Sequence, residues 1–509
     1  MPDTGVFDKL FIFEMANNHM GDVEHGIRVI REHHDAAQGF DFRFAFKLQY
    51  RHLDTFIHPA FRGRTDFKYV KRFSETRLDA SELRAMKDEM VRLGFVAICT
   101  PFDEKSVDLI EEHGFDIIKI ASCSFNDWPL LERIAQADKP VIASTAGAAL
   151  EDIDKVVAFW EHRQRNLCLM HCVGSYPTQT NQLELNQIDF LRSRYAGIPV
   201  GYSTHEDPAN TDAVKIAVSK GAVALERHVG VPTDEYGMNA YSSTPEQIRA
   251  WLVAAQTAYE MCGVSGRRRD ICEKEKSDLR GLQRGVFAVT RMDDGEKMGE
   301  NKVFYAIPNC PEQYVANDLS KYRKFRATVP IEKGEAILES NASFTDSREK
   351  IVAIVKNLKD LIIQSGVRLP NRLDFELSHH YGIDKFGQHG CAIVNCINRE
   401  YCKKIILLLA GQKNPIHHHM RKEETFHVLY GEVEIDLQGS RRTYCEGDFI
   451  VVERGVKHSF RSDTGAVLEE VSTTHFTDDS FYEDEAITNN SDRKTLMTFW
   501  IDWLEKPIK

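Results

Sequence analysis

The chain has 509 residues, which is too long for a single hydrophobic core, so we expect about two to four domains. Hydrophobic residues make up 42% and charged residues 28%, ordinary values for a soluble globular protein. The formal net charge of −12 leaves no excess of Lys and Arg to replace the counterions of a nucleic-acid backbone. We therefore expect no nucleic acid as the main partner.

The first residues, "MPDTGVFDKLFIFEMANN", lack the basic leader and apolar core of a secretory signal. No apolar run approaches the ~20 residues of a membrane-spanning helix. The 11 cysteines show no framework spacing, which favours reduced thiols. These features predict a cytoplasmic protein without a membrane partner.

Eight short apolar runs alternate with longer amphipathic segments over residues 1–270. The runs are "KLFIFE", "FRFAFKLQ", "FVAICTPF", "DIIKIAS", "PVIAST", "LCLMHCVG", "IPVGYSTH" and "AVALERH". Near-continuous apolar strands separated by helices indicate a parallel sheet that helices cover. Eight such units predict an α/β fold of the (β/α)8 TIM-barrel type, with a doubly wound open sheet as the alternative.

Each apolar run ends in a polar group. In chain order these are Glu14, Lys47 with Gln49, Thr100, Lys119 with Ser122, Ser144 with Thr145, His171 with Tyr176, Ser203 with His205, and Glu226 with His228. The carboxyl ends of barrel strands converge on one mouth, where active sites lie. One such residue would usually be a helix cap, but eight in phase predict a functional site.

The chemistry of this set is specific. Two cations and four hydroxyls suit a phosphate or phosphocarboxylate: Lys47, Lys119, Thr100, Ser122, Ser144 and Ser203. His205 and His228 end neighbouring strands, so their rings could share a divalent metal that polarises a carbonyl. Glu14 and Glu226 could supply acid–base chemistry. For either histidine alone, a core residue bonded to backbone would be the simpler interpretation.

Seven motifs in order carry a resemblance. "FEMANNHMGD", "FKLQY", "CTPFDEKSVDLIEEHGFDIIKIAS", "KPVIASTAG", "LMHCVGSYPTQ", "GYSTHE" and "ALERHV" resemble the sialic acid synthase family over roughly the first two thirds of the chain. The resemblance implies condensation of phosphoenolpyruvate with an aldose, usually N-acetylmannosamine, to a 3-deoxy-2-ulosonic acid. Phosphoenolpyruvate C3 would attack the aldehyde, water would add at C2, and phosphate would leave by C–O cleavage.

The resemblance also implies roles for individual residues. Lys47, Thr100, Lys119, Ser122, Ser144 and Ser203 match phosphoenolpyruvate contacts, and Gln49 and Tyr176 match sugar contacts. His205 and His228 match ligands of a divalent metal, Mn²⁺ first and Mg²⁺ second, and Glu14 and Glu226 match acid–base carboxylates.

Three positions depart from the family pattern. Ser124 stands where a sugar-binding carboxylate is frequent, Gly174 where an asparagine precedes the tyrosine, and Asn239 near the expected position of an aspartate. At least the first and last face the acceptor in the family, so the donor half is kept and the acceptor half is altered. We therefore predict that the acceptor is not plain N-acetylmannosamine.

Residues 271–346 alternate hydrophobic residues with glycine turns and resemble the antifreeze-like domain that follows the barrel in sialic acid synthases. There an arginine touches the sugar in the partner's active site, and Arg284 matches that position. The alternative for Arg284 is a solvated surface arginine. The resemblance also implies a homodimer. Residues 347–385 predict a helical connector, in which "REKIVAIVKNLKDLIIQSG" reads as a helix ending at Gly366.

Residues 386–509 consist of short strands with tight turns, as in a small antiparallel jelly roll. His417 and His419 would point to one face of a strand, Glu424 follows, and His458 lies in a second segment. This arrangement resembles the two cupin motifs, which implies a divalent metal, Mn²⁺, Zn²⁺, Fe²⁺ or Ni²⁺, on these four residues. Glu423 competes for the carboxylate role, and the second motif carries Glu453 where proline is usual.

The stretch "HHHMRKEETFHVLYGE" looks most like sugar-isomerase cupins of the D-lyxose isomerase type, which would convert a ketose into the aldose that the barrel consumes. A sugar-sensing regulatory cupin is the alternative, because cupins host many functions. Two further hypotheses concern the whole chain: a sugar-binding regulator with an impaired barrel, and a lyase without phosphate chemistry. Retention of both lysines, both histidines and both glutamates speaks against the regulator. The lysine–hydroxyl set speaks against an imine-forming lyase, which needs one buried lysine.

Overall fold

The computed structural model describes residues 4–299, 301–369, 374–490 and 492–497. The chain divides into two compact units, Met1–Asp270 and Ile271–Lys509. No helix in these described ranges is long and apolar enough to span a bilayer. All 11 cysteines are free thiols, so no disulfide links the described elements.

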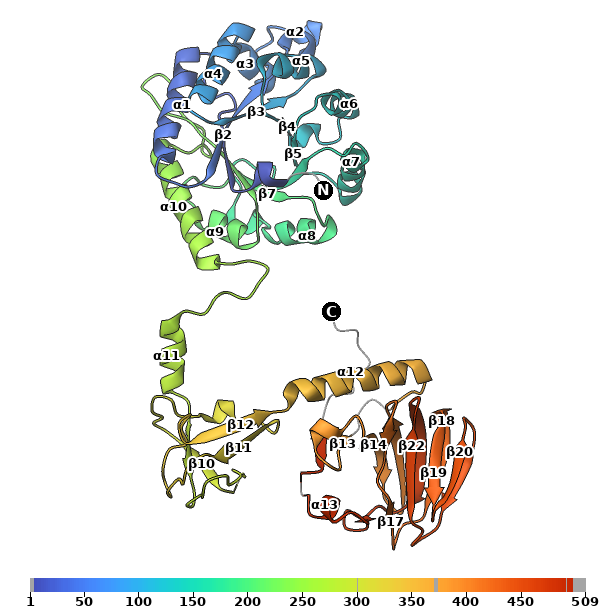
Figure 1. Cartoon of the computed structure of the whole chain (residues 1–509). Coiled ribbons are helices and arrows are strands. Elements are labelled where there is room, and N and C mark those ends of the chain that lie inside the picture. The colour runs from blue at the N-terminus through green and yellow to red at the C-terminus, as the bar shows by residue number, and fades with distance from the viewer. Residues whose placement is uncertain (1–3, 300, 370–373, 491, 498–509) are drawn as a thin grey trace. The chain divides into compact units, whose positions relative to one another are not determined.

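The first unit is a closed barrel of eight parallel strands in chain order, as predicted (Figure 1). The strands are β1 (Leu10–Glu14), β2 (Arg43–Tyr50), β3 (Val96–Pro101), β4 (Ile117–Ile120), β5 (Val141–Ser144), β6 (Leu167–Cys172), β7 (Val200–Thr204) and β8 (Ala224–His228). Closure is made by β1 and β8, whose ends meet where Glu14 pairs in register with His228. The carboxyl ends of the strands therefore form one mouth.

Helices surround the barrel and follow from local sequence signals. They are α1 (Val23–Ala37), α2 (Leu53–Phe56), α3 (Lys68–Glu75), α4 (Ala80–Arg92), α5 (Glu104–His113), α6 (Trp128–Gln136), α7 (Leu150–His162), α8 (Asn186–Arg194), α9 (Asp212–Ser219) and α10 (Pro245–Cys262). Asp79 and Glu82 form a capping box at the start of α4. Gly114 ends α5 at φ 72°, a left-handed conformation that glycine adopts without strain.

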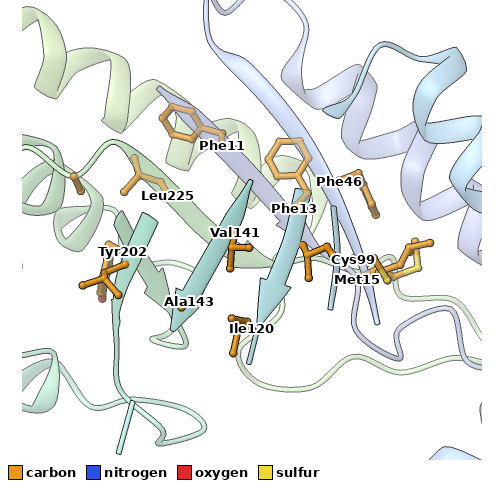
Figure 2. Close-up of a cluster of buried hydrophobic side chains, with 14 of the residues drawn as sticks. Phe11, Phe13, Met15, Phe46, Cys99, Ile120, Val141, Ala143, Tyr202 and Leu225 are labelled. Atoms are coloured by element: carbon orange, nitrogen blue, oxygen red, sulfur yellow. The ribbon is translucent and has the colours of Figure 1, made fainter. Parts of the chain in front are cut away.

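Alternate residues of the strands face the helices or the barrel interior. Phe11, Phe13 and Leu225 pack with helix residues in the outer layer, several of whose members are labelled in Figure 2. The opposite parity fills the barrel itself, and this interior cluster consists of strand residues together with Phe7: Leu10, Ile12, Ala45, Ile98, Ile117, Ile142, Cys168, Met170 and Ala224. Continuing the inward parity toward the mouth gives Glu14, Lys47, Thr100, Lys119, Ser144, Ser203 and Glu226. The sequence thus places its polar strand-end residues inside the barrel, above an apolar plug.

The second unit begins with α11 (Glu273–Gly281) and a small β region. Two antiparallel pairs form it: β9 (Gly285–Ala288) with β10 (Val303–Ala306), and β11 (Arg323–Ala327) with β12 (Ala342–Asp346). They share a core that includes Val286, Met292 and Ile337.

The helix predicted after this region is α12 (Arg348–Ser365), and it ends at Gly366 as expected. Its apolar face, with Ile351, Val355 and Leu358, packs into the core of the following β domain. The predicted connector also contains β13 (Asp374–Ser378), which pairs with β14 and so lies in the sheet of that domain. We propose that the last domain begins with this strand and not at residue 386.

The last domain consists of two antiparallel sheets, which agrees with the predicted jelly roll (Figure 1). The seven-stranded sheet has the order β21 (Phe449–Val452), β18 (Glu424–Gly431), β23 (Ala466–Thr473), β15 (Tyr401–Leu408), β14 (Cys391–Asn398), β13 and β25 (Lys494–Met497). The other has the order β20 (Ser440–Tyr444), β19 (Val433–Leu437), β22 (His458–Ser462), β17 (His417–His418) and β24 (Phe481–Tyr482), and β16 (Gln412–Lys413) pairs with β22. A short helix, α13 (Glu485–Thr488), follows β24.

Candidate active site and metal centre

Four charged side chains form a buried network at the mouth of the barrel. Lys119 donates to both carboxylate oxygens of Glu226, at 3.1 and 3.0 Å. Lys47 lies 3.0 Å from Glu226 Oε2 and forms a closer ion pair with Glu14. All four side chains are at most 5% exposed. The two predicted cations and two predicted carboxylates are therefore one ionic cluster from four strands.

The cluster holds its members in defined charge states. Burial opposes the Lys47 ammonium, but Glu14 and Glu226 outweigh it and raise the pKa of Lys47. Burial likewise opposes the Glu226 carboxylate, but Lys119 and Lys47 outweigh it and hold the pKa of Glu226 far below its usual range. Burial lowers the pKa of Lys119, with Glu226 acting against it. Paired in this way, charges that would be costly to bury are tolerated.

Four hydroxyls predicted to contact a phosphate lie around this network. Ser203 donates to Glu226 Oε1 at 2.9 Å, and Ser122 Oγ accepts from the Ala146 amide at 3.3 Å. The hydroxyls of Thr100 and Ser144 are buried without a hydrogen-bond partner among the described residues. Because buried hydroxyls are normally paired, these two are available to a ligand.

The two histidines predicted to bind metal lie together, with ring centroids 5.2 Å apart. Burial and the neighbouring His228 lower the pKa of His205 to about 3. Burial and Lys47 lower the pKa of His228 to about 3 as well, so both rings are neutral at pH 7. Nδ1 of His205 is 3.2 Å from Val173 O, and Nδ1 of His228 is buried without a partner in the described chain. Neutral rings with an unengaged nitrogen fit a shared divalent cation.

The four predicted sugar contacts differ in their positions. Gln49 donates to Glu14 Oε1 at 3.3 Å, so it borders the ionic cluster. Tyr176 is 56% exposed, and its ring centroid lies 4.3 Å from that of His205.

Asn239 accepts from the Tyr241 amide, and Tyr241 in turn contacts His228 with ring centroids 5.1 Å apart. Arg284 lies in the second unit, with its guanidinium 5.5 Å from the Tyr305 ring centroid, so its role in the barrel site stays a prediction.

One strand-end residue lies on the other side of the barrel wall. His171 has the outward parity of β6, bonds to Leu183 O at 2.8 Å and stacks on Tyr202. The expectation that it belongs to the mouth is therefore wrong, because the alternation of the strand turns it away. Ser124, at the position of an expected carboxylate, is buried at 6% exposure and brings no charge to the mouth.

In the last domain, three histidines converge. His417, His419 and His458 are buried, and their candidate ligand atoms all lie within 4.8 Å of one another. Each ring is oriented by a backbone carbonyl: His417 Nδ1 lies 3.0 Å from Pro415 O, His458 Nδ1 lies 3.1 Å from Val456 O, and His419 Nδ1 bonds to Asp479 O. These bonds place the protons on Nδ1 and leave the Nε2 lone pairs free.

Glu424 completes the group. Its Oε2 lies 3.1 Å from His458 Nε2 and its Oε1 lies 3.5 Å from His419 Nε2. Both Glu424 Oε2 and His458 Nε2 are buried without a hydrogen bond in the described residues. Two facing lone pairs at this distance are unfavourable unless a cation lies between them, so the donor set fits a divalent metal.

Sequence reasoning missed the buried charges beside this centre. Lys422 contacts Glu424 Oε1 and lies 3.0 Å from Glu470 Oε1. Ser472 donates to the same Glu470 oxygen at 3.2 Å. Lys422 stands two residues before Glu424 and could have been suspected, but Glu470 lies on β23 and only the fold brings it close.

The competing residues of the histidine row are excluded by position. Glu423 is exposed, whereas Glu424 is 3% exposed. His418 stacks on Phe481 with centroids 5.3 Å apart, and His427 stacks on Phe449 at 4.1 Å, away from the three converging rings. Strand alternation selects His417 and His419 from the row.

The barrel and its polar mouth place the first unit among TIM-barrel enzymes by fold and site, and the last domain is a cupin. The NeuB family model matches residues 37–266, and the cupin domain model matches residues 404–472. A crystal structure from Chromobacterium violaceum, assigned as spore coat polysaccharide biosynthesis protein E, shares 55% sequence identity with a TM-score of 0.65. That match covers 66% of this chain and 99% of the other. The chain belongs to the NeuB family.

Two curated relatives carry names that state an activity. The N-acetylneuraminate-9-phosphate synthase of Drosophila melanogaster is 27% identical over 280 residues, which is 53% of this chain and 73% of the relative. The N,N'-diacetyllegionaminic acid synthase of Campylobacter jejuni is 23% identical over 301 residues, which is 58% of this chain and 89% of the relative.

Proposed function

We propose that the barrel condenses phosphoenolpyruvate with an aldose to a 3-deoxy-2-ulosonic acid and releases phosphate. The observation that carries this proposal is the buried cluster of Lys47, Lys119, Glu14 and Glu226 beside two unpaired hydroxyls. Two ammonium groups and free hydroxyl donors suit a phosphate ester better than a neutral sugar. Membership of the NeuB family, with relatives named as ulosonic acid synthases, supports the same reaction class.

The residues divide the work by position. Lys47 and Lys119 exchange part of their pairing with Glu14 and Glu226 for the donor phosphate, and Thr100 and Ser144 donate to its oxygens. The freed carboxylates are then close enough to hold the proton of the attacking water or of the new hydroxyl. A divalent cation on His205 and His228 would polarise the aldehyde carbonyl.

Phosphate release tests the proposal. Purified full-length protein is mixed with phosphoenolpyruvate, Mn²⁺ or Mg²⁺ and a panel of aldoses, and phosphate and product mass are followed. Aldose-dependent phosphate release supports the synthase. Binding of sugars without any turnover would instead support the alternative of a sugar-binding regulator.

For the cupin, we propose a metal-dependent aldose–ketose isomerase that supplies the acceptor. Lys422 and Glu470 favour this over a binding module, because a buried carboxylate beside the three imidazoles can take up and return a proton, while the ammonium 3.0 Å away holds it. A divalent cation there would polarise a sugar carbonyl, Glu470 Oε1 would take the proton from one carbon and return it to the neighbouring carbon, and the Lys422 ammonium would hold that carboxylate in place.

Deuterium incorporation separates the two roles of the cupin. The full-length protein is incubated with metal and candidate ketoses in deuterated water, and the aldose is examined for deuterium at C2. The Glu226→Gln variant, altered only in the barrel, should exchange as wild type does. Sugar binding without exchange would favour a sensor.

A further inference from the structure

Arg51 lies at the mouth of the barrel but belongs to none of the predicted sets. It follows β2 directly and continues the inward parity of Ala45, Lys47 and Gln49. Its Nη2 donates to Gln49 Oε1 at 2.8 Å, and Gln49 Nε2 donates to Glu14 Oε1 at 3.3 Å. Arg51 is therefore joined to the ionic cluster through the residue predicted to contact the sugar.

The guanidinium is fixed between two aromatic rings. Its Cζ lies 3.6 Å from the ring centroid of Phe102, just after β3, and 4.1 Å from that of Phe73 on α3. These two ring contacts hold the guanidinium and leave its edge for hydrogen bonds. On that edge, Nε is buried and has no hydrogen-bond partner in the described part of the chain.

No carboxylate of the described residues forms an ion pair with this cation. Among the described residues Arg51 makes no ion pair, and the two carboxylates that act on its charge are engaged elsewhere: Glu14 with Lys47, and Asp103 with the amides of His52 and Ser106. Ser124 adds none. Burial lowers the pKa of Arg51 to about 10, which leaves it charged at pH 7. A buried guanidinium without a counter-charge is costly unless a ligand provides one.

We propose that Arg51 determines acceptor specificity, and that the acceptor is an aldose bearing an anionic group, a phosphate or a carboxylate, which the open edge of Arg51 binds. This inference rests on the proposed condensation and deepens it. Two oxygens of a carboxylate or a phosphate match the guanidinium edge in spacing and charge. The donor phosphate already has Lys47 and Lys119, with Gln49 standing between that cluster and Arg51.

The test compares matched sugars. Phosphate release from phosphoenolpyruvate is measured with N-acetylmannosamine, its 6-phosphate and its 6-uronate, and with the same three forms of mannose and glucose. At least one anionic form should exceed its neutral parent by tenfold or more in kcat/KM. The phosphate and uronate arms show which anion is meant.

Variants assign the preference to the side chain. Arg51→Gln should abolish the anionic preference through the KM of the acceptor, leaving the KM for phosphoenolpyruvate within twofold. Arg51→Lys should keep part of the preference for the anionic acceptor. Arg28→Gln, an exposed arginine of α1, is the control and should match wild type. Circular dichroism and melting temperature establish that each variant folds.

Two results would overturn the inference. One is a neutral sugar used as well as both anionic forms; the other is an Arg51→Gln variant that raises the KM for phosphoenolpyruvate and keeps the acceptor preference. Direct binding of the same sugars without phosphoenolpyruvate, by saturation-transfer NMR, separates this failure from that of the synthase. Arg51-dependent binding of an anionic sugar without turnover contradicts only the proposed reaction. Equal binding of anionic and neutral sugars overturns the anion site.

Discussion

Lys119 donates to both oxygens of Glu226, and this pair, from β4 and β8, spans the interior of the barrel at its mouth. Water cannot hydrate either charge, since both side chains are at most 5% exposed. Lys119 therefore depends on Glu226 for its counter-charge, while Glu226 is also held by Lys47 and Ser203. A phosphate ester that takes over Lys119 would release the Glu226 carboxylate for chemistry.

The Glu226→Gln variant should lose both activity and stability. Acid–base catalysis usually contributes 10²–10⁴-fold, so we expect phosphate release to fall by about that factor. Leaving two buried ammonium groups with one carboxylate should lower the free energy of unfolding by roughly 3–5 kcal/mol. Activity and urea unfolding measure the two effects. Glu151→Gln, in the exposed first turn of α7, is the control, and it should leave phosphate release and the free energy of unfolding close to the wild-type values.

The hydroxyls of Thr100 and Ser144 should affect the donor and not the fold. Because neither makes a hydrogen bond in the described residues, Thr100→Val and Ser144→Ala should leave the melting temperature of the free protein unchanged or slightly raised. The KM for phosphoenolpyruvate should rise by about tenfold in each, as expected for a lost hydrogen bond to a charged group.

The control for these hydroxyls is Thr204→Val, a buried strand-end position on the outward side of β7. It should leave the KM for phosphoenolpyruvate near the wild-type value. An equal rise in the KM of all three variants would mean that general loosening of the barrel, and not a contact with the donor, is being measured.

Much of the barrel and of its candidate site could be predicted from the sequence. Eight apolar runs with polar ends predict the barrel. Residue alternation along the strands places Lys47 and Lys119 on the inward face and His171 on the outward face. Arg51 escaped prediction because its meaning depends on Phe73 and Phe102, which approach it only in the folded chain. Strand β13 was missed because its pairing partner, β14, is needed to reveal it as part of the sheet.

Metal should stabilise the cupin through its converging histidines. Adding Mn²⁺, Zn²⁺, Fe²⁺ or Ni²⁺ to metal-stripped protein should raise the melting temperature of the second unit, because binding to the folded state alone stabilises it. His417→Ala and His458→Ala should abolish the shift. His427→Ala, whose ring stacks on Phe449 instead, should retain it, and loss in all three would contradict the site.

A buried histidine of the barrel should make stability fall in acid. His33 on α1 is fully buried, and burial lowers its pKa from 6.5 to about 4. Above pH 6.5 both folded and unfolded states carry it neutral; below, the unfolded state takes up the proton first, so stability is lost as the pH falls from 6.5 to 4. At pH 5 the loss should be about 2 kcal/mol.

His33→Asn, which cannot titrate, isolates this contribution. The difference between its unfolding free energy and that of wild type should shift by about 2 kcal/mol in favour of the variant on going from pH 7.5 to pH 5. His162→Asn, at an exposed position of α7, is the matched control substitution. Parallel pH curves for wild type and His33→Asn would refute the assignment.

The fate of the bridging oxygen of phosphoenolpyruvate tests the proposed condensation most directly. The full-length protein is incubated with donor labelled with ¹⁸O at that position, divalent metal, and each aldose of the panel. Condensation with C–O cleavage should give aldose-dependent release of phosphate that retains the label, in equal amount to a new 3-deoxy-2-ulosonic acid. Phosphate release that no aldose stimulates, or a new sugar acid formed without phosphate, would contradict it.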